Sequence, residues 1–137
     1  MSVKGRNDMS KQKVFTVRAE IAANLTIENI DDIMVSALEG GISYWCSEAE
    51  VVEEKRCADW GHEQIARGGA LILHDAESDD KWELNLEKFL NGFKLWLENG
   101  GDQYGAVENG EVDCCEIDGG CADEIVQYGI FGEVVFG

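Results

Sequence analysis

The first part of the chain alternates between apolar and polar residues. This period of two over residues 14–21 predicts a half-buried strand, one face of which carries Phe15, Val17, Ala19 and Ile21. Residues 1–12, which precede it, are polar and basic and predict a disordered tail. The rest of the chain, residues 13–137, shows neither a repeat nor a linker and predicts a single domain.

Three later stretches place apolar residues at helical spacing. The first begins after Thr26, a typical N-cap residue, and ends where Gly40 and Gly41 favour a helix stop. The second covers residues 87–98, and the third covers roughly residues 121–131.

Two shorter apolar stretches predict a β-hairpin. Residues 70–74 form a dense apolar run, which is typical of a well-covered strand. Residues 82–86 alternate between apolar and polar side chains, and the polar residues 78–81 between the two stretches predict the turn.

The remaining stretches complete the expected fold. Residues 47–56 predict a further helix, and residues 58–67 fit another short helix that carries Trp60 and Ile65 inward. The last five residues, 133–137, are mostly apolar and are expected to dock on the body. The elements together predict an α+β fold, in which a small antiparallel sheet has about three helices packed on one face.

The charge of the chain is strongly unbalanced. Asp and Glu number 28 against 11 Lys and Arg, so the formal net charge is −17 at pH 7. The first 18 residues carry five basic side chains and one acid, whereas residues 19–137 carry 27 acids and six bases. Such an acidic body repels phosphate and attracts basic protein surfaces, so direct binding to nucleic acid is not expected. The simpler alternative is that the acids keep a small protein in solution.

Hydropathy and cysteine usage predict where the protein resides. No run of 18 apolar residues is present, so we expect no membrane-spanning helix, and the polar N-terminus lacks the apolar core of a secretion signal. The five cysteines are an odd number, for which reduced thiols are the simplest interpretation. These features predict a cytoplasmic protein that does not contact membranes.

The residue spacings predict no metal ion. Zinc requires closely paired ligands, but Cys46 and Cys57 are far apart and are expected to be small buried hydrophobic residues. The acids at positions 75, 77 and 79 match the first ligands of an EF-hand loop. Asp80 and Leu86, however, stand where that loop requires glycine and glutamate. A solvated hairpin turn is the simpler interpretation of these acids.

The chain also lacks the motifs of an enzyme. It has no G-x-S-x-G, no phosphate-binding Walker loop and no H-E-x-x-H. The pair His74 and Asp75 at a strand end could orient an imidazole, but nothing supplies a nucleophile and an oxyanion site beside it. We therefore expect a protein that is not an enzyme and has no cofactor.

Aromatic residues offer an alternative ligand site. Trp45 and Trp82 lie where predicted elements begin, so their rings could stack on the base of a small nucleotide. Arg67 could supply the cation that a phosphate group requires. Such a pocket would suit the interface of a homo-oligomer.

Three blocks of sequence resemble those of a known family of proteins. They are ALEGGI followed by YWC within residues 37–46, LILHDAE over residues 71–77, and KFLNGFKLW over residues 88–96. With these blocks the chain, over about residues 25–137, resembles a family of short acidic proteins carried by phages and prophages of Gram-positive gut bacteria. The resemblance implies no enzymatic role and no particular site residue. Phage proteins of this size and acidity often inhibit bacterial defence, as anti-CRISPR proteins do, and some of them imitate the charge of DNA.

The leading hypothesis is a phage-encoded, non-enzymatic inhibitor of a bacterial defence system. Its acidic surface would act as a DNA mimic on the basic nucleic-acid groove of a host protein such as a CRISPR effector, with an affinity that falls with salt. The predicted contacts are acids on helix faces and turns: Asp31, Asp32, Glu50, Glu53, Glu54, Asp75, Glu77, Asp79 and Asp80. The alternatives are a sponge that sequesters a cyclic-nucleotide immune signal, with Trp45, Trp82 and Arg67 as ligand contacts, and a phage accessory protein that binds another phage protein.

Overall fold

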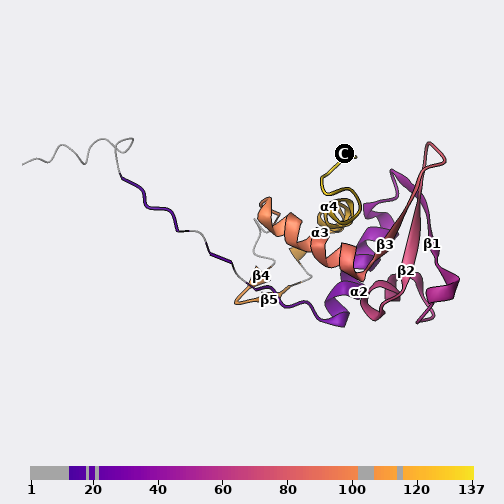
Figure 1. Ribbon diagram of the computed structural model, residues 1–137, viewed down its shortest axis with the longest axis horizontal. Coiled ribbons are helices and arrows are strands. Elements are labelled where there is room, and N and C mark those ends of the chain that lie inside the picture. Colours follow the sequence, from indigo (N-terminus) through magenta and orange to yellow (C-terminus); the bar gives the residue numbers. More distant parts are fainter. Residues whose placement is uncertain (1–12, 18, 21, 102–106, 114–115) are drawn as a thin grey trace, which may run out of the picture.

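A small antiparallel sheet and a layer of helices form the fold. The computed structural model describes residues 13–17, 19–20, 22–101, 107–113 and 116–137, so the predicted tail, residues 1–12, lies outside it. Its main elements are α2 (Ile27–Ser36), β1 (Cys46–Val51), β2 (Ala70–Asp75), β3 (Lys81–Asn85), α3 (Leu86–Glu98), β4 (Val107–Glu108), β5 (Glu111–Val112) and α4 (Gly119–Phe131). The α+β prediction is confirmed (Figure 1). None of the helices in the described ranges is long and apolar enough to cross a membrane.

The central sheet has the strand order β1-β2-β3, and both pairings are antiparallel. Leu71 lies opposite Leu84, and Leu73 lies opposite Trp82, so these side chains share the inner face. Leu71, Leu73 and Leu84 are fully buried against the three helices, which gather on one side of the sheet in Figure 1. The predicted hairpin over residues 70–86 is therefore confirmed.

Each α-helix begins at a residue whose side chain caps its first turn. Thr26 Oγ1 accepts a hydrogen bond from the Asn29 amide at 3.0 Å, and Asn29 Oδ1 accepts one from the Thr26 amide. Asn85 caps α3 through the Lys88 amide, and Asp118 caps α4 in the same way. These side chains satisfy amides that the helices leave unpaired, which explains why the elements start there.

Helices α3 and α4 cross at two glycines. A Cβ atom on Gly92 would collide with the Ile125 carbonyl oxygen and with the Gly129 amide of α4. In turn, a Cβ on Gly129 would lie 2.6 Å from the Lys88 carbonyl oxygen. The two backbones can approach this closely only because neither residue has a side chain.

A buried polar network fastens the C-terminus to the body. Gln127 Oε1 accepts hydrogen bonds from the amides of Val135 and Phe136, both at 2.8 Å. Its amide group donates to the buried carboxylate of Asp123, which also accepts from Trp45 Nε1 at 2.8 Å and from the Tyr44 hydroxyl at 2.6 Å.

This network keeps Tyr44 in its protonated form and holds the terminal aromatic ring. Partial burial and the adjacent Asp123 carboxylate raise the pKa of Tyr44 to about 12, so its hydroxyl remains a donor at neutral pH. The Phe136 ring stacks on Trp45 with a centroid distance of 5.0 Å. The prediction that residues 133–137 dock on the body is therefore confirmed for this ring.

Two predicted elements are wrong. Residues 14–21 do not form a strand in their described part, because Val14, Phe15 and Val17 are 79–88% exposed and pair with no other strand. Residues 47–56 are not a helix either. They form most of β1, which pairs along β2, and then a short 3₁₀ helix (Glu53–Lys55). The pairing partner in β2 overrides the helical preference of the glutamates.

Residues 58–67 and the cysteines show smaller differences. Two 3₁₀ helices (Gly61–Glu63 and Ile65–Arg67) replace the single short helix, and Ile65 is buried as expected. Trp60 is 66% exposed rather than inward. Cys46 is buried as expected, but Cys57 is exposed, because its segment runs over the surface between β1 and the first of these 3₁₀ helices.

Replacing Gly92 by alanine tests the close helix crossing. We expect Gly92→Ala to lower the free energy of unfolding by about 2 kcal/mol or more, because the methyl group forces α3 and α4 apart. The same change in an unobstructed helix stabilises by up to ~1 kcal/mol. Urea denaturation measures the difference. The control is Gly61→Ala, where nothing lies within 4 Å of the added Cβ, and a Gly92→Ala protein as stable as this control contradicts the crossing.

Replacing Gln127 tests the C-terminal network. Gln127→Leu keeps the volume but leaves the Val135 and Phe136 amides and the Asp123 carboxylate short of partners, so we expect a loss of about 2–4 kcal/mol in the free energy of unfolding. Tryptophan fluorescence during urea denaturation reports the loss. Asn91→Ala, at an exposed position on α3, serves as the control and changes stability by less than about 0.5 kcal/mol. An unchanged urea midpoint for Gln127→Leu contradicts the role given to this network.

Candidate acidic docking surface

The outer face of the three-stranded sheet is the face that the helices leave uncovered. Cross-strand partners share a face, so Glu50, Ile72 and Glu83 form one row across β1, β2 and β3. A second row next to it consists of Glu48, His74 and Lys81. The face therefore combines one half-buried isoleucine with three glutamates, His74 and Lys81.

A shallow hollow opens on this outer face. Its volume is about 360 Å³, and Ile72 of β2 lines it together with Val51 and Val52. Four carboxylates surround it, because β1 leads directly into the 3₁₀ helix that carries two of them: Glu50, Glu53, Glu54 and Glu83. The structure thus brings together three of the acids predicted as contacts and adds Glu83.

Basic residues neutralise some of these carboxylates. Lys55 Nζ lies 3.0 Å from Glu83 Oε2, and Arg56 donates to both carboxylate oxygens of Glu53 at 2.9 and 2.8 Å. The Arg56 hydrogen bonds lower the pKa of Glu53. His74 Nε2 lies 2.9 Å from Glu50 Oε1.

The turn between β2 and β3 holds the other acidic group. Asp75 Oδ1 accepts a hydrogen bond from the Glu77 amide at 3.0 Å, and its second oxygen accepts one from the Ser78 hydroxyl at 2.7 Å. These bonds lower the pKa of Asp75, and they make this residue the organiser of the turn. The side chains of Glu77, Asp79 and Asp80 are exposed.

The two predicted contacts on α2 lie apart from the outer face. Asp31 forms a two-pronged ion pair with Arg67, with N···O distances of 2.9 and 3.0 Å, and this pair joins α2 to the Ile65–Arg67 3₁₀ helix. Arg67 also donates to the Glu63 carbonyl oxygen. Asp31 therefore has a structural partner, whereas Asp32 is exposed.

The predicted aromatic ligand residues lie in packed surroundings. Trp45 is 2% exposed, and its ring is stacked on Phe136 and 6.0 Å from Trp82. The other side of Trp82 meets Phe131 edge-on, at a centroid distance of 4.9 Å. Neither indole lines the hollow on the sheet or the larger groove described below. Arg67 directs its guanidinium to Asp31.

Six exposed carboxylates lie on the outer face and its turn, and one of them, Glu50, contacts His74. They run from the hairpin tip along the edge strand β1 and into the 3₁₀ helix: Glu77, Asp79, Asp80, Glu48, Glu50 and Glu54. We call this set the acidic stripe. Among the described residues, the carboxylates of Glu48 and Glu54 form no hydrogen bond or ion pair.

The sequence analysis did not select Glu48, because it predicted a helix there. It did not select Glu83 either, because that residue lies in an ordinary predicted hairpin strand. Strand alternation in the correct register would have identified both residues. The sequence analysis also selected no contact residue in the C-terminal part of the chain, which contains no Lys or Arg after Lys94. That absence of bases is visible in the sequence and marks a second acidic region around β4 and β5.

The described residues contain no group of three or more His, Cys, Asp or Glu side chains arranged to hold a metal ion. Cys114 and Cys115 lie outside the described ranges. Burial and the adjacent Asp118 carboxylate raise the pKa of Cys121 to about 11, so this thiol is protonated at neutral pH and is a poor nucleophile.

The chain was also compared with known proteins. Protein-family models, curated proteins and solved structures all fail to match it. The assignment of a function therefore depends on the geometry and charge of the molecule.

A ligand titration tests the aromatic alternative. We expect cyclic mono- and dinucleotides to leave the melting temperature unchanged, because the rings of Trp45 and Trp82 are already packed against aromatic partners. A ligand present at 100 times its dissociation constant would stabilise the fold by about 2.7 kcal/mol, which thermal-shift measurements detect easily. A saturable increase that Trp82→Ala abolishes contradicts this expectation.

Proposed function

We propose that this protein is a non-enzymatic inhibitor whose acidic stripe docks on a basic, nucleic-acid-binding groove of another protein. The partner would be a nucleic-acid-binding protein of a bacterial defence system, such as a CRISPR effector, and the carrier would be a phage. The main support is the exposed line of carboxylates along β1 and the hairpin tip, for which the body supplies few bases. Such a surface attracts positively charged grooves and speeds encounter with them.

The spacing of the stripe suits a partial imitation of a nucleic-acid backbone. Glu48 and Glu50 are two residues apart on one strand, so their side chains emerge about 6.6 Å apart. One strand of DNA carries a phosphate every ~3.4 Å along the helix axis. Along β1 the stripe therefore has about half the charge per unit length that one DNA strand has along the helix axis. It would fill only some of the phosphate positions in a groove, so part of the affinity must come from uncharged contacts.

Ile72 and its hollow provide such an uncharged contact. The half-buried isoleucine lies between Glu50 and Glu83 in the middle of the outer face. Protein interfaces commonly combine a central apolar contact with a polar or charged rim. A partner that places an apolar side chain in this hollow would distinguish the stripe from DNA.

Edge protection is the competing explanation for the glutamates of β1. Charged side chains on an edge strand prevent pairing with other chains, so Glu48 and Glu50 have a use without any partner. That explanation does not extend to Glu54 or to the hairpin tip, which lie outside the strand. The two explanations predict different effects of charge reversal on binding.

Displacement of DNA from defence nucleases tests the proposal. A panel of purified CRISPR effectors is loaded with fluorescently labelled DNA, and this protein is added at low salt. We expect it to release DNA from at least one effector, with an apparent affinity that falls about tenfold or more when the salt is raised to 0.5 M. Failure to release DNA from every effector, or release that salt leaves unchanged, contradicts the proposal.

Charge reversal locates the interaction on the stripe. We expect Glu48→Lys/Glu54→Lys to weaken displacement about tenfold or more, because two attractive contacts become repulsive. The matched control is Glu39→Lys/Glu133→Lys, which changes the net charge equally at exposed positions after α2 and after α4, outside both the stripe and the groove. Equal weakening by both pairs would show that total charge, and not the stripe, determines inhibition.

A further inference from the structure

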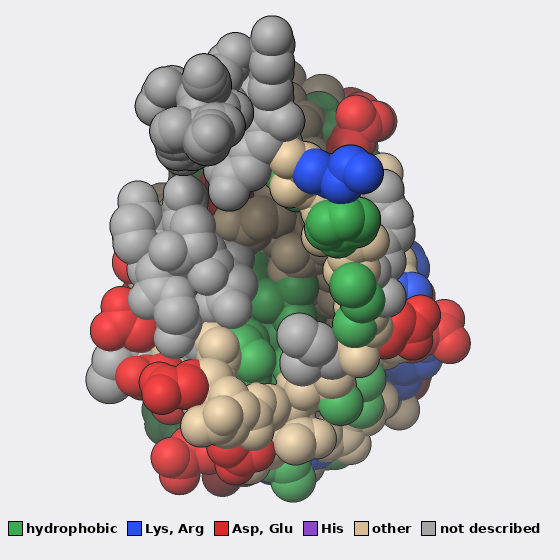
Figure 2. All heavy atoms as spheres, turned by 90° about the vertical axis from the view of Figure 1, so that its left-hand side faces the viewer, with side chains coloured by type: hydrophobic (Ala, Val, Ile, Leu, Met, Phe, Trp, Pro, Cys, Tyr) green, Lys and Arg blue, Asp and Glu red, His purple; other side chains and the backbone are tan. Residues whose placement is uncertain are grey.

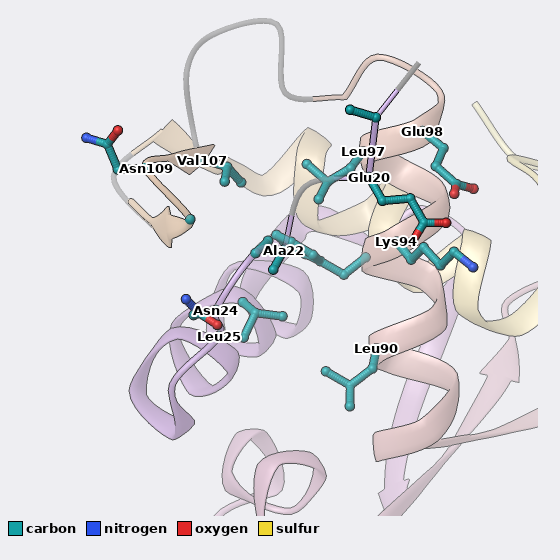
Figure 3. Close-up of a pocket in the computed structure, with 14 residues that line it drawn as sticks. Glu20, Ala22, Asn24, Leu25, Leu90, Lys94, Leu97, Glu98, Val107 and Asn109 are labelled. Atoms are coloured by element: carbon teal, nitrogen blue, oxygen red, sulfur yellow. The ribbon is translucent and has the colours of Figure 1, made fainter. Parts of the chain in front are cut away.

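A large groove lies on the side of the molecule away from the sheet. It has a volume of about 1170 Å³, and three segments line it: the chain before α2, one side of α3, and the β4–β5 hairpin. Figure 3 shows Leu25, Leu90, Leu97 and Val107 around it. Phe93 lines its floor.

The chain before this groove is an extended arm. Residues 13–17 leave the body without contacting it, as Figure 1 shows, and Val14, Phe15 and Val17 are 79%, 81% and 88% exposed. The alternating pattern that predicts a strand here is thus present without a partner. Exposed apolar side chains in such a run indicate a surface that another element covers.

The arm and the groove match in spacing. On an extended arm Phe15, Val17 and Ala19 emerge on one side at intervals of about 6.6 Å. On α3 Leu90 and Leu97 lie two turns apart, which corresponds to about 10.5 Å. An extended segment of three alternating apolar residues therefore covers the exposed length of the α3 wall.

Charge also matches the two surfaces. The first 18 residues carry five basic side chains against one acid. The groove is lined by Glu20 and Glu98, and Glu108 and Glu111 flank the turn that closes one end of it. Figure 2 shows hydrophobic side chains in the middle of this face and acidic ones around its margin. Among the described lining residues Lys94 is the only base.

The arm cannot easily return to its own groove. Residues 19–20 and 22–25 already form one wall of the groove, and the arm continues outward from them. To fold back, the chain would need a tight reversal between residues 17 and 22. That stretch contains no Gly, Pro, Asn or Asp, which are the residues that favour turns.

We propose that the N-terminal arm of one chain lies in the groove of a second copy, and that the second copy returns its own arm in the same way. Such a two-fold exchange covers both apolar arms and brings Lys13 of each arm toward the acidic margin of the other groove. The exchange is independent of the proposed function, because the acidic stripe lies on the other side of the molecule (Figure 1). The dimer would present two stripes.

Sedimentation velocity in reducing buffer tests the exchange, over a broad range of protein concentration. We expect the mass to rise toward twice the 15.1 kDa of one chain. Phe15→Ser/Val17→Ser should weaken self-association about a hundredfold or more, because apolar side chains leave both contacts of the dimer. The matched control is Val14→Ser, which changes an equally exposed residue on the opposite side of the arm and should retain the dimer.

Mixing two variants that are each expected to be monomeric distinguishes arm exchange from any other mode of dimerisation. Leu90→Gln alters the groove wall and should also give monomers, with circular dichroism confirming that α3 is intact. An equimolar mixture of Phe15→Ser/Val17→Ser with Leu90→Gln restores one intact arm and one intact groove, so we expect a heterodimer to return. A monomer at every concentration, or a dimer that neither arm nor groove variants weaken, overturns the proposal.

Discussion

The shortage of basic residues within the folded body is the constraint on which its surface chemistry depends. Residues 19–137 contain six bases for 27 acids, so internal ion pairs can neutralise only a minority of the carboxylates. Three of those bases are taken up by Glu83, Glu53 and Asp31. Most other carboxylates must face solvent or a partner, because burying an unpaired charge costs more than the fold can supply. The buried Asp123 shows the exception, since three donors surround it.

The distribution of the remaining acids gives the molecule two different sides. The outer sheet face presents the acidic stripe around a half-buried Ile72, and the opposite side presents an apolar groove with acidic margins. The first arrangement suits a basic groove, and the second suits a segment that is both apolar and basic. The N-terminal arm of this chain has that second composition. The same excess of negative charge can therefore support both self-association and binding to a partner.

The sequence predicted those parts of the fold that local patterns determine. Helices α2, α3 and α4 have helical spacing and begin at capping side chains, and β2 and β3 are dense in apolar residues. The sequence did not predict β1, because its glutamates favour a helix locally and only pairing with β2 makes the segment a strand. The strand predicted for the arm is wrong for the opposite reason. Its pattern is that of a strand, but within the described ranges of the same chain no strand pairs with it.

The candidate site was predictable in composition but not in arrangement. Exposed acids could be selected from the sequence, yet the pairing of Asp31 with Arg67 and of Glu53 with Arg56 depends on tertiary contacts and on a local turn. Trp45 was selected as a pocket residue, but Phe136 from the far end of the chain covers its ring. Contacts between residues so distant in sequence leave no signal in a local pattern.

The effective charge of the folded protein tests the central claim most directly, namely that its carboxylates are exposed and uncompensated. Electrophoretic mobility at pH 7 can be measured with and without calcium, together with equilibrium dialysis of the metal. The account predicts a strongly negative mobility in line with the formal charge of −17 and no saturable calcium binding. A mobility close to neutral, or stoichiometric calcium binding that removes most of the charge, would contradict it.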